Sequence, residues 1–212
     1  MSRFGPDPQT FFDTVYRDVP PWDVGGAQPA LDALFAECAP EGPILDVGCG
    51  SGDLALALAR AGHRVVGVDF VEAAVELARA KAAALPAETA SLIEFRVADA
   101  LRPSQISGPF RSVVDSGFLH LFDADERDHF ARELAATLPE GGRYYLLAFA
   151  VTFPIPNAPA AVTEDEVRSR FSRAAGWDVR VCRPAEFHSR VAPPVPATCA
   201  VVERRNLPAR LV

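Results

Sequence analysis

Short apolar runs alternate with amphipathic stretches along most of this chain. The runs are rich in β-branched residues, which is typical of buried strands. Between them, apolar residues recur at every third or fourth position, which predicts helices that bury one face. The predicted strands lie at 43–47, 64–68, 93–97, 110–114 and 143–150, and the predicted helices that follow strands at 52–61, 71–85 and 124–138.

Further elements precede and follow this alternating segment. The predicted helices outside it lie at 9–18, 28–38 and 163–173, with a proline-rich loop at 152–160 and two last strands at about 177–187 and 197–205. The two last strands follow one another closely, so we expect them to form a hairpin. Alternating strands and helices indicate an α/β fold with a parallel sheet. We expect a single domain overall, in which residues 1–38 form a helical lid on residues 39–212.

Composition narrows the class of protein. The chain has 212 residues, 49% of them hydrophobic, and a formal net charge of -7. A protein that binds nucleic acid or an anionic membrane needs a basic surface, so neither partner is expected. The sequence has no run of 18 apolar residues and no apolar stretch near its start, so we expect neither a membrane span nor secretion, but a cytoplasmic protein.

Cysteine and histidine residues give no sign of a metal site. The four cysteines lie far apart and include no CxxC pair, which predicts free thiols in a reducing compartment. The four histidines show no spacing typical of metal ligands. We therefore expect no bound metal.

A glycine-rich turn follows the first predicted strand. Asp46, Gly48, Gly50 and Gly52 alternate with other residues, and the second strand leads into Asp69. A dinucleotide-binding fingerprint would place its third glycine at position 53, which is aspartate here. An acid two residues before the first glycine and a second acid after the next strand resemble motif I and the acidic loop of class I S-adenosylmethionine (SAM)-dependent methyltransferases.

This resemblance covers roughly residues 40–205 and implies how the cofactor is bound. In the family pattern, Asp46 orders the turn and the methionine end of SAM, and Asp69 accepts hydrogen bonds from both ribose hydroxyls. The fold it implies is a Rossmann-like, mostly parallel sheet of seven strands, with the last strand antiparallel and helices on both faces. The expected cofactor-binding residues are Trp22, Asp46, Gly48, Cys49, Gly50, Gly52, Asp69, Phe70, Asp99, Ala100, Asp115 and Ser116.

Two other segments bear on the methyl acceptor. Asp115-Ser116-Gly117-Phe118 resembles motif IV but lacks the prolines usual in methyltransferases that act on nucleic-acid bases. The stretch from Pro20 to Pro29 looks like the Pro-Trp-Asp segment of thiopurine, thiol and halide methyltransferases, in which the tryptophan, here Trp22, lies against SAM. A small-molecule acceptor is therefore expected.

The acceptor pocket is expected to be aromatic. Its predicted walls are Phe11, Phe12, Tyr16, Phe118, Phe149 and Phe153, joined at the rim by the loop at 188–196. The candidate general bases are His120 and Asp23, although His120 lies in an apolar run and a structural role is also open. A thiolate or halide acceptor would need little or no general base.

The sequence thus predicts methyl transfer from SAM, with S-adenosylhomocysteine as product, to sulfur or oxygen of a small apolar or aromatic molecule. Carbon, nitrogen and halide acceptors stay open, as do roles in natural-product tailoring and in detoxification. A non-catalytic SAM-binding regulator and an NAD-dependent oxidoreductase are the alternatives. The chain is expected to act as a monomer or homodimer.

Overall fold

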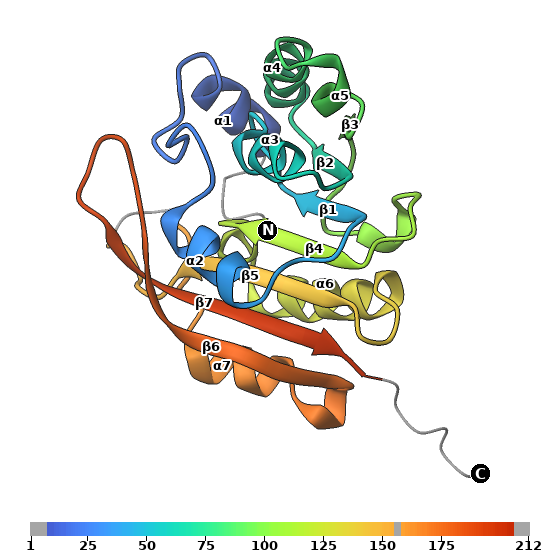
Figure 1. Cartoon of the computed structure of the whole chain (residues 1–212). Coiled ribbons are helices and arrows are strands. Elements are labelled where there is room, and N and C mark those ends of the chain that lie inside the picture. Colours follow the sequence, from blue (N-terminus) through green and yellow to red (C-terminus); the bar gives the residue numbers. More distant parts are fainter. Residues whose placement is uncertain (1–7, 155–157, 206–212) are drawn as a thin grey trace.

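The computed structural model describes residues 8–154 and 158–205. Seven strands form one sheet in the order β3-β2-β1-β4-β5-β7-β6 (Figure 1). The strands are β1 (Ile44–Val47), β2 (Val65–Asp69), β3 (Ile93–Val97), β4 (Ser112–Ser116), β5 (Arg143–Phe149), β6 (Trp177–Phe187) and β7 (Val195–Arg204). Of these, β7 alone runs antiparallel to its neighbours β5 and β6. The predicted seven-stranded, mostly parallel sheet is confirmed.

Helices cover both faces of this sheet (Figure 1). They are α1 (Pro8–Val15), α2 (Pro29–Glu37), α3 (Asp53–Arg60), α4 (Glu72–Ala83), the short α5 (Ala87–Ala90), α6 (Ala124–Thr137) and α7 (Glu164–Arg170). Side chains alternate between faces along a strand. In β5, Tyr144 and Leu146 belong to the core beneath α6 and α7, whereas Tyr145 and Leu147 belong to the core beneath α2 and α3. The sheet is therefore buried on both sides, as a parallel sheet requires.

Local differences from the expected elements have simple causes. Strand β4 begins at Ser112 rather than at residue 110, because Phe110 turns into the core before the ladder starts. Helix α7 ends at Arg170 and a short 3-10 turn, Arg173–Ala175, follows it. The expected helix at 163–173 thus splits in two.

The N-terminal segment plays two roles in the fold. Helix α2 packs on the sheet through Leu31 and Leu34, both fully buried, and so belongs to the main core. The part that covers the carboxyl ends of the strands is residues 8–28, shorter than the expected lid of 1–38, whose first seven residues lie outside the described part. We call residues 8–28 the lid segment.

The lid segment is tied to the loop between β6 and β7, which lies beside it (Figure 1). The Gln28 amide donates from Nε2 to the carbonyl of His188 at 3.0 Å, and its Oε1 accepts from the His188 amide at 2.8 Å. The amide of Arg190 donates to the carbonyl of Pro21 at 2.9 Å. The two bonds of Gln28 join residues 160 apart in the sequence, and with the Arg190 bond they let the sheet edge hold the lid in place.

In the described parts of the chain, no helix is both long enough and apolar enough to cross a membrane. No group of three or more potential metal-binding side chains was found among the described residues either.

Candidate active site

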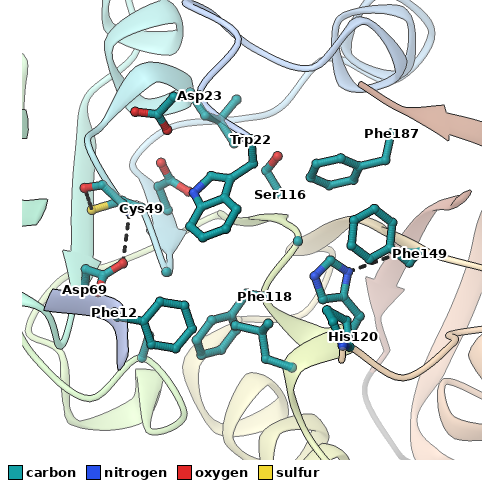
Figure 2. A pocket seen from close by; sticks show the side chains of 18 of the residues that line it. Phe12, Trp22, Asp23, Cys49, Asp69, Ser116, Phe118, His120, Phe149 and Phe187 are labelled. Carbon is teal, nitrogen blue, oxygen red and sulfur yellow. Dashed lines mark hydrogen bonds between the residues drawn. The ribbon is translucent and has the colours of Figure 1, made fainter. Parts of the chain in front are cut away.

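A cavity of about 720 Å³ lies under the lid segment, at the carboxyl ends of the central strands (Figure 2). This is the edge at which open α/β sheets bind ligands. The cavity brings together most of the residues singled out from the sequence. Those that line it are Phe11, Phe12, Tyr16, Trp22, Asp23, Asp46, Gly48, Cys49, Gly50, Asp69, Phe70, Asp99, Ala100, Ser116, Phe118, His120, Phe149 and Phe153.

Asp69 lies at the carboxyl end of β2 with both oxygens already held by the backbone. Its Oδ2 accepts from the Gly50 amide at 2.9 Å and its Oδ1 from the Val71 amide at 2.9 Å. Burial raises the pKa of this carboxyl group, and the amide hydrogen bonds oppose that rise. Each carboxylate oxygen has a second lone pair, so a fixed Asp69 can still accept two hydroxyl groups from a ligand.

One carboxylate oxygen of Asp46, in β1, lacks a hydrogen-bond donor. Asp46 is 1% exposed, and its Oδ2 has no hydrogen-bond partner within the described chain. Burial, followed by repulsion from Asp115 and Asp69, raises the pKa of its carboxyl group well above the usual value. A buried carboxylate oxygen without a donor is costly. A cationic or hydrogen-bond-donating ligand group in the cavity would remove that cost.

The three glycines of the turn have different neighbours. A Cβ added at Gly50, where φ is +52°, would stand 2.6 Å from the Tyr16 hydroxyl, under the lid. A Cβ at Gly48 would lie 2.5 Å from the Phe118 ring. At Gly52, where φ is +87°, it would collide with Phe95 and Ala78.

Gly52 is not among the residues that line the cavity, and its expected contact with the cofactor stays a prediction. Its lack of a side chain lets α3 approach α4 and β3, so its role is in packing. Gly48 and Gly50 keep the backbone of the turn close to the cavity, as expected.

Asp115 is also kept out of the cavity. It is fully buried, and its carboxylate accepts from the Phe118 amide at 2.6 Å, the Leu119 amide at 3.0 Å and the Tyr144 hydroxyl at 2.6 Å. Burial raises the pKa of Asp115 to about 6 despite these donors. The next residue, Ser116, lines the cavity, while Asp115 shapes the loop that follows β4.

Asp46 and Asp69 form the acidic end of the cavity. Its far side is lined by Phe70, Ala100 and Asp99, another acid expected to bind the cofactor. The Asp99 side chain is 59% exposed, and its Oδ1 accepts from the Leu101 amide at 3.0 Å. Phe70 meets Phe12 of α1 edge to face, with ring centroids 5.7 Å apart. These residues form a shallow wall between β3 and the lid segment.

Polar contacts fasten the lid segment to the glycine turn. The Ser51 hydroxyl donates to Asp23 Oδ2, and Lys81 Nζ donates to Ser51 Oγ at 2.7 Å and to Asp53 Oδ1 at 2.6 Å. Asp53 Oδ2 in turn accepts from the Gly25 amide at 3.2 Å. We call Asp23, Ser51, Asp53 and Lys81 the lid clasp. Asp23 was a candidate base, but its carboxylate is engaged in this clasp.

Trp22 crosses the cavity between the acidic and aromatic ends (Figure 2). Its ring meets that of Tyr16 edge to face, with centroids 6.3 Å apart. Cys49 lies opposite, at the acidic end, where burial raises the pKa of its thiol well above the usual value. The thiol is therefore protonated and unsuited to act as a nucleophile.

His120 lies at the opposite, aromatic end. Its ring stacks on Phe149, with centroids 4.3 Å apart, and faces Phe187 at 6.1 Å. The Phe149 amide donates to His120 Nδ1 at 3.1 Å. Burial, and then the nearby charge of Arg127, lower the pKa of His120 to about 3. The imidazole is neutral at physiological pH, and so low a pKa makes it a weak base.

Arg127 of α6 fixes the backbone that carries His120. It donates to the carbonyls of Leu119 at 3.2 Å and Ala160 at 3.0 Å, and pairs with Glu166 at 2.8 Å. The Ala160 amide donates to the His120 carbonyl at 2.8 Å. A buried guanidinium thus joins α6, α7 and the proline-rich loop behind the aromatic end.

Several wall residues were not predicted from the sequence. Phe187 packs against Phe149, with centroids 4.8 Å apart, and Gln28 lines the cavity beneath the β6–β7 loop. Because β6 runs parallel to β5, its carboxyl end lies at the same edge. Applying the rule for strand ends to β6 would have identified Phe187 from the sequence.

The fold and the site together define an α/β protein of the class I methyltransferase type. Residues 44–142 match the family model described as a methyltransferase domain. Over 191 residues the chain is 30% identical to a 2-heptyl-1-hydroxyquinolin-4(1H)-one methyltransferase of Mycobacteroides abscessus, covering 85% of this chain and 82% of that protein. A probable thiol methyltransferase of Arabidopsis thaliana is 29% identical over 69% of this chain and 64% of its own.

Two solved structures are similar to this chain over most of its length. One, from work on the conversion of a disulfide bond into a thioacetal group during echinomycin biosynthesis, has a TM-score of 0.80 at 28% identity and covers 96% of this chain and 95% of its own. A 1,6-didemethyltoxoflavin-N1-methyltransferase of Burkholderia thailandensis, with bound S-adenosylhomocysteine, has a TM-score of 0.71 at 25% identity over 94% of this chain and 88% of its own.

The chain therefore belongs to the SAM-dependent methyltransferases that act on small molecules. SAM is the cofactor, as expected from the glycine turn and its acids.

Proposed function

We propose that this enzyme transfers the methyl group of SAM to an oxygen or sulfur atom of a small aromatic molecule. The observation that carries the proposal is the division of one cavity into an acidic end, with Asp46 and Asp69, and an aromatic end, with His120, Phe149 and Phe187. The first end suits a ligand rich in donors, and the second suits a flat apolar ring.

In this proposal Asp69 accepts both ribose hydroxyls, and the unpartnered oxygen of Asp46 accepts from the amino group of the methionine part. Gly48, Cys49 and Gly50 lie along the cofactor. Trp22, Phe70, Asp99, Ala100 and Ser116 complete its site. When bound, SAM supplies an electrophilic methyl group on a positively charged sulfur. The residues of the chain orient the acceptor and exclude water, which together account for much of a methyl transfer.

The lid segment is the part that excludes water. The lid clasp and the bonds of Gln28 and Arg190 hold it across the cavity. Phe11, Phe12, Tyr16, Phe118 and Phe153 would then complete the acceptor pocket. An acceptor enclosed in this way is a small molecule, not a protein surface.

The names of two relatives support a small aromatic or thiol acceptor. The relative from Mycobacteroides abscessus acts on a hydroxylated quinolone, and the Arabidopsis relative is a probable thiol methyltransferase. We further propose that the enzyme acts in the cytoplasm as a monomer or homodimer.

The test is incubation of the purified chain with methyl-labelled SAM and one acceptor at a time: a hydroxyquinolone, a phenol, an aromatic thiol, an aromatic amine and iodide. The expected result is label in the hydroxyquinolone or the thiol. Label only in the amine or in iodide would contradict the proposal. Binding of S-adenosylhomocysteine without turnover of any acceptor would favour the non-catalytic alternative.

A further inference from the structure

The ring of His120 is held in one tautomer by a backbone amide. A backbone N–H can only donate, so the 3.1 Å bond from the Phe149 amide makes His120 Nδ1 an acceptor. Neutral imidazole carries one hydrogen, which must then lie on Nε2. The Phe149 ring stacked 4.3 Å away and the Ala160 amide on the His120 carbonyl keep the side chain in this orientation.

The second ring nitrogen faces the cavity. In Figure 2 the Nδ1 side of His120 is joined to Phe149, while the other ring nitrogen points toward the open centre of the pocket, below Trp22. Within residues 8–154 and 158–205, no group accepts a hydrogen bond from Nε2. This side chain therefore presents a rigid, unused donor to whatever occupies the aromatic end.

We propose that His120 Nε2–H donates a hydrogen bond to an oxygen of the methyl acceptor, and that the acceptor is a hydroxylated aromatic ring bound as its conjugate base. This inference rests on the proposed function and specifies its substrate class. It replaces the sequence-based expectation that His120 is a general base, because an Nε2 that carries the hydrogen has no lone pair to receive another.

The remaining lining residues support an acceptor that is already ionised. Asp23, the other candidate base, is held in the lid clasp. Among the described residues that line the cavity there is neither lysine nor arginine, so a donor to an oxyanion at the aromatic end must be a neutral group such as His120 Nε2–H. A weakly acidic hydroxyl group loses its proton to water before it enters, and no base is then required.

Ionised acceptors with two conjugated oxygens fit this arrangement best. In an N-hydroxy-4-quinolone the negative charge is shared between the N-oxide and the ring carbonyl oxygens. A hydrogen bond from Nε2 to one oxygen then stabilises the anion and leaves the other free to react. In the transfer, a lone pair of that oxygen forms the bond to the methyl carbon, the carbon–sulfur bond breaks, and its electron pair stays on sulfur. The two opposite charges cancel and no proton moves.

The first experiment compares three substitutions of His120. In His120→Gln the amide nitrogen replaces Nε2 as a donor, but the amide cannot take up a proton. In His120→Asn the side-chain oxygen replaces Nδ1 and the donor is lost, and His120→Phe removes both. Thermal unfolding and the affinity for S-adenosylhomocysteine serve as controls for folding. With 1-hydroxyquinolin-4(1H)-one as acceptor, His120→Gln is expected to keep at least about a third of kcat/KM.

The Asn and Phe variants are expected to lose about tenfold or more, because a hydrogen bond to a charged group contributes at least that factor. The second experiment is an ultraviolet titration of the same quinolone bound to the enzyme with S-adenosylhomocysteine, which needs no turnover. The pKa of the bound quinolone is expected to be about one unit lower in the wild type and His120→Gln than in His120→Phe.

Two results would overturn the inference. If His120→Gln is as impaired as His120→Phe, the histidine acts as a base. If all three variants keep wild-type activity and the same pKa of the bound quinolone, Nε2 does not touch the acceptor. These outcomes differ from failure of the proposed function, in which the wild type binds S-adenosylhomocysteine but methylates neither oxygen nor sulfur acceptors.

Discussion

The two ends of the cavity are built in different ways. The acidic end comes from one continuous stretch, β1, the glycine turn, α3 and β2, and within it Asp69 is positioned by the backbone amides of Gly50 and Val71. The aromatic end is assembled from the ends of β4, β5 and β6, and a buried ion pair between α6 and α7 holds it from behind. Local structure therefore fixes the cofactor end, whereas tertiary packing fixes the acceptor end.

The difference suggests how such enzymes can change substrate. A change at the aromatic end alters packing between distant segments without disturbing the glycine turn. A change at the acidic end affects a motif whose geometry is set by glycines with positive φ. We expect substitutions at the two ends to be separable in binding and in stability.

The largest expected effect comes from breaking the ion pair behind the aromatic end. Arg127→Met removes a buried guanidinium from Glu166, which keeps Arg170 as a partner, and from the carbonyls of Leu119, Ala160 and Ala161. Removing one partner of a buried pair costs about 3–5 kcal/mol. Urea unfolding should show a loss of that size. Arg173→Met is the control, since the exposed Arg173–Asp178 pair contributes about 0–1 kcal/mol. Equal losses in the two variants would show that the Arg127 network does not support the aromatic end.

The next effect separates two glycines within the turn. Gly52→Ala forces a Cβ to within 2.7 Å of Phe95 at φ +87°, so we expect a loss of about 2–4 kcal/mol from overpacking and backbone strain. Gly50→Ala meets the hydroxyl of Tyr16 and should lower the affinity for S-adenosylhomocysteine more than the stability. Adding Tyr16→Phe should restore part of that affinity. If Tyr16→Phe also restored the affinity for S-adenosylhomocysteine in Gly52→Ala, the two glycines would not have these separate roles.

A smaller effect depends on pH. His120 has a pKa of about 3 in the folded protein against 6.5 when unfolded, so the unfolded chain binds the extra proton between these values. The stability that neutral His120 provides is present above pH 6.5 and is lost as the pH falls below it. From pH 7 to 5.5, the free energy of unfolding of the wild type should fall by about 1.3 kcal/mol relative to that of His120→Phe.

Asp115 acts in the opposite direction. Its pKa of about 6 in the folded protein lies above the unfolded value of 3.8, so its contribution to stability is lost as the pH rises from 3.8 to 6. Asp115 titrates in the same way in both proteins, so the difference between wild type and variant isolates the contribution of His120. Urea unfolding at both pH values gives the two differences, and an unchanged difference would show that His120 is not buried in its neutral form.

The smallest effect concerns the lid clasp. Lys81 is 40% exposed, so Lys81→Met should cost less than about 1 kcal/mol in stability. It should weaken S-adenosylhomocysteine binding a few-fold, because the lid segment must then be ordered by the ligand. Arg111→Met, which breaks an exposed pair with Glu41, is the matched control. Calorimetry on both variants checks this, and identical affinities would show that the clasp does not hold the lid.

The sequence predicted the acidic end more completely than the aromatic end, for a physical reason. Asp46 lies in β1 and Asp69 ends β2 within a contiguous motif, so their location could be predicted from local pattern alone. Phe187 and Gln28 reach the cavity only because β7 enters the sheet between β5 and β6 and carries the adjoining loop to the lid. Asp115 and Gly52 match the motif, but their contacts lie within the protein, which no local pattern reveals.

The most direct test of the two-ended cavity is calorimetric titration with S-adenosylhomocysteine of the wild type, Asp69→Asn and His120→Phe. We predict that Asp69→Asn weakens binding about 100-fold, since two hydrogen bonds to a carboxylate are impaired, while His120→Phe leaves affinity within about twofold. Equal weakening in both variants, or none in Asp69→Asn, would contradict the account.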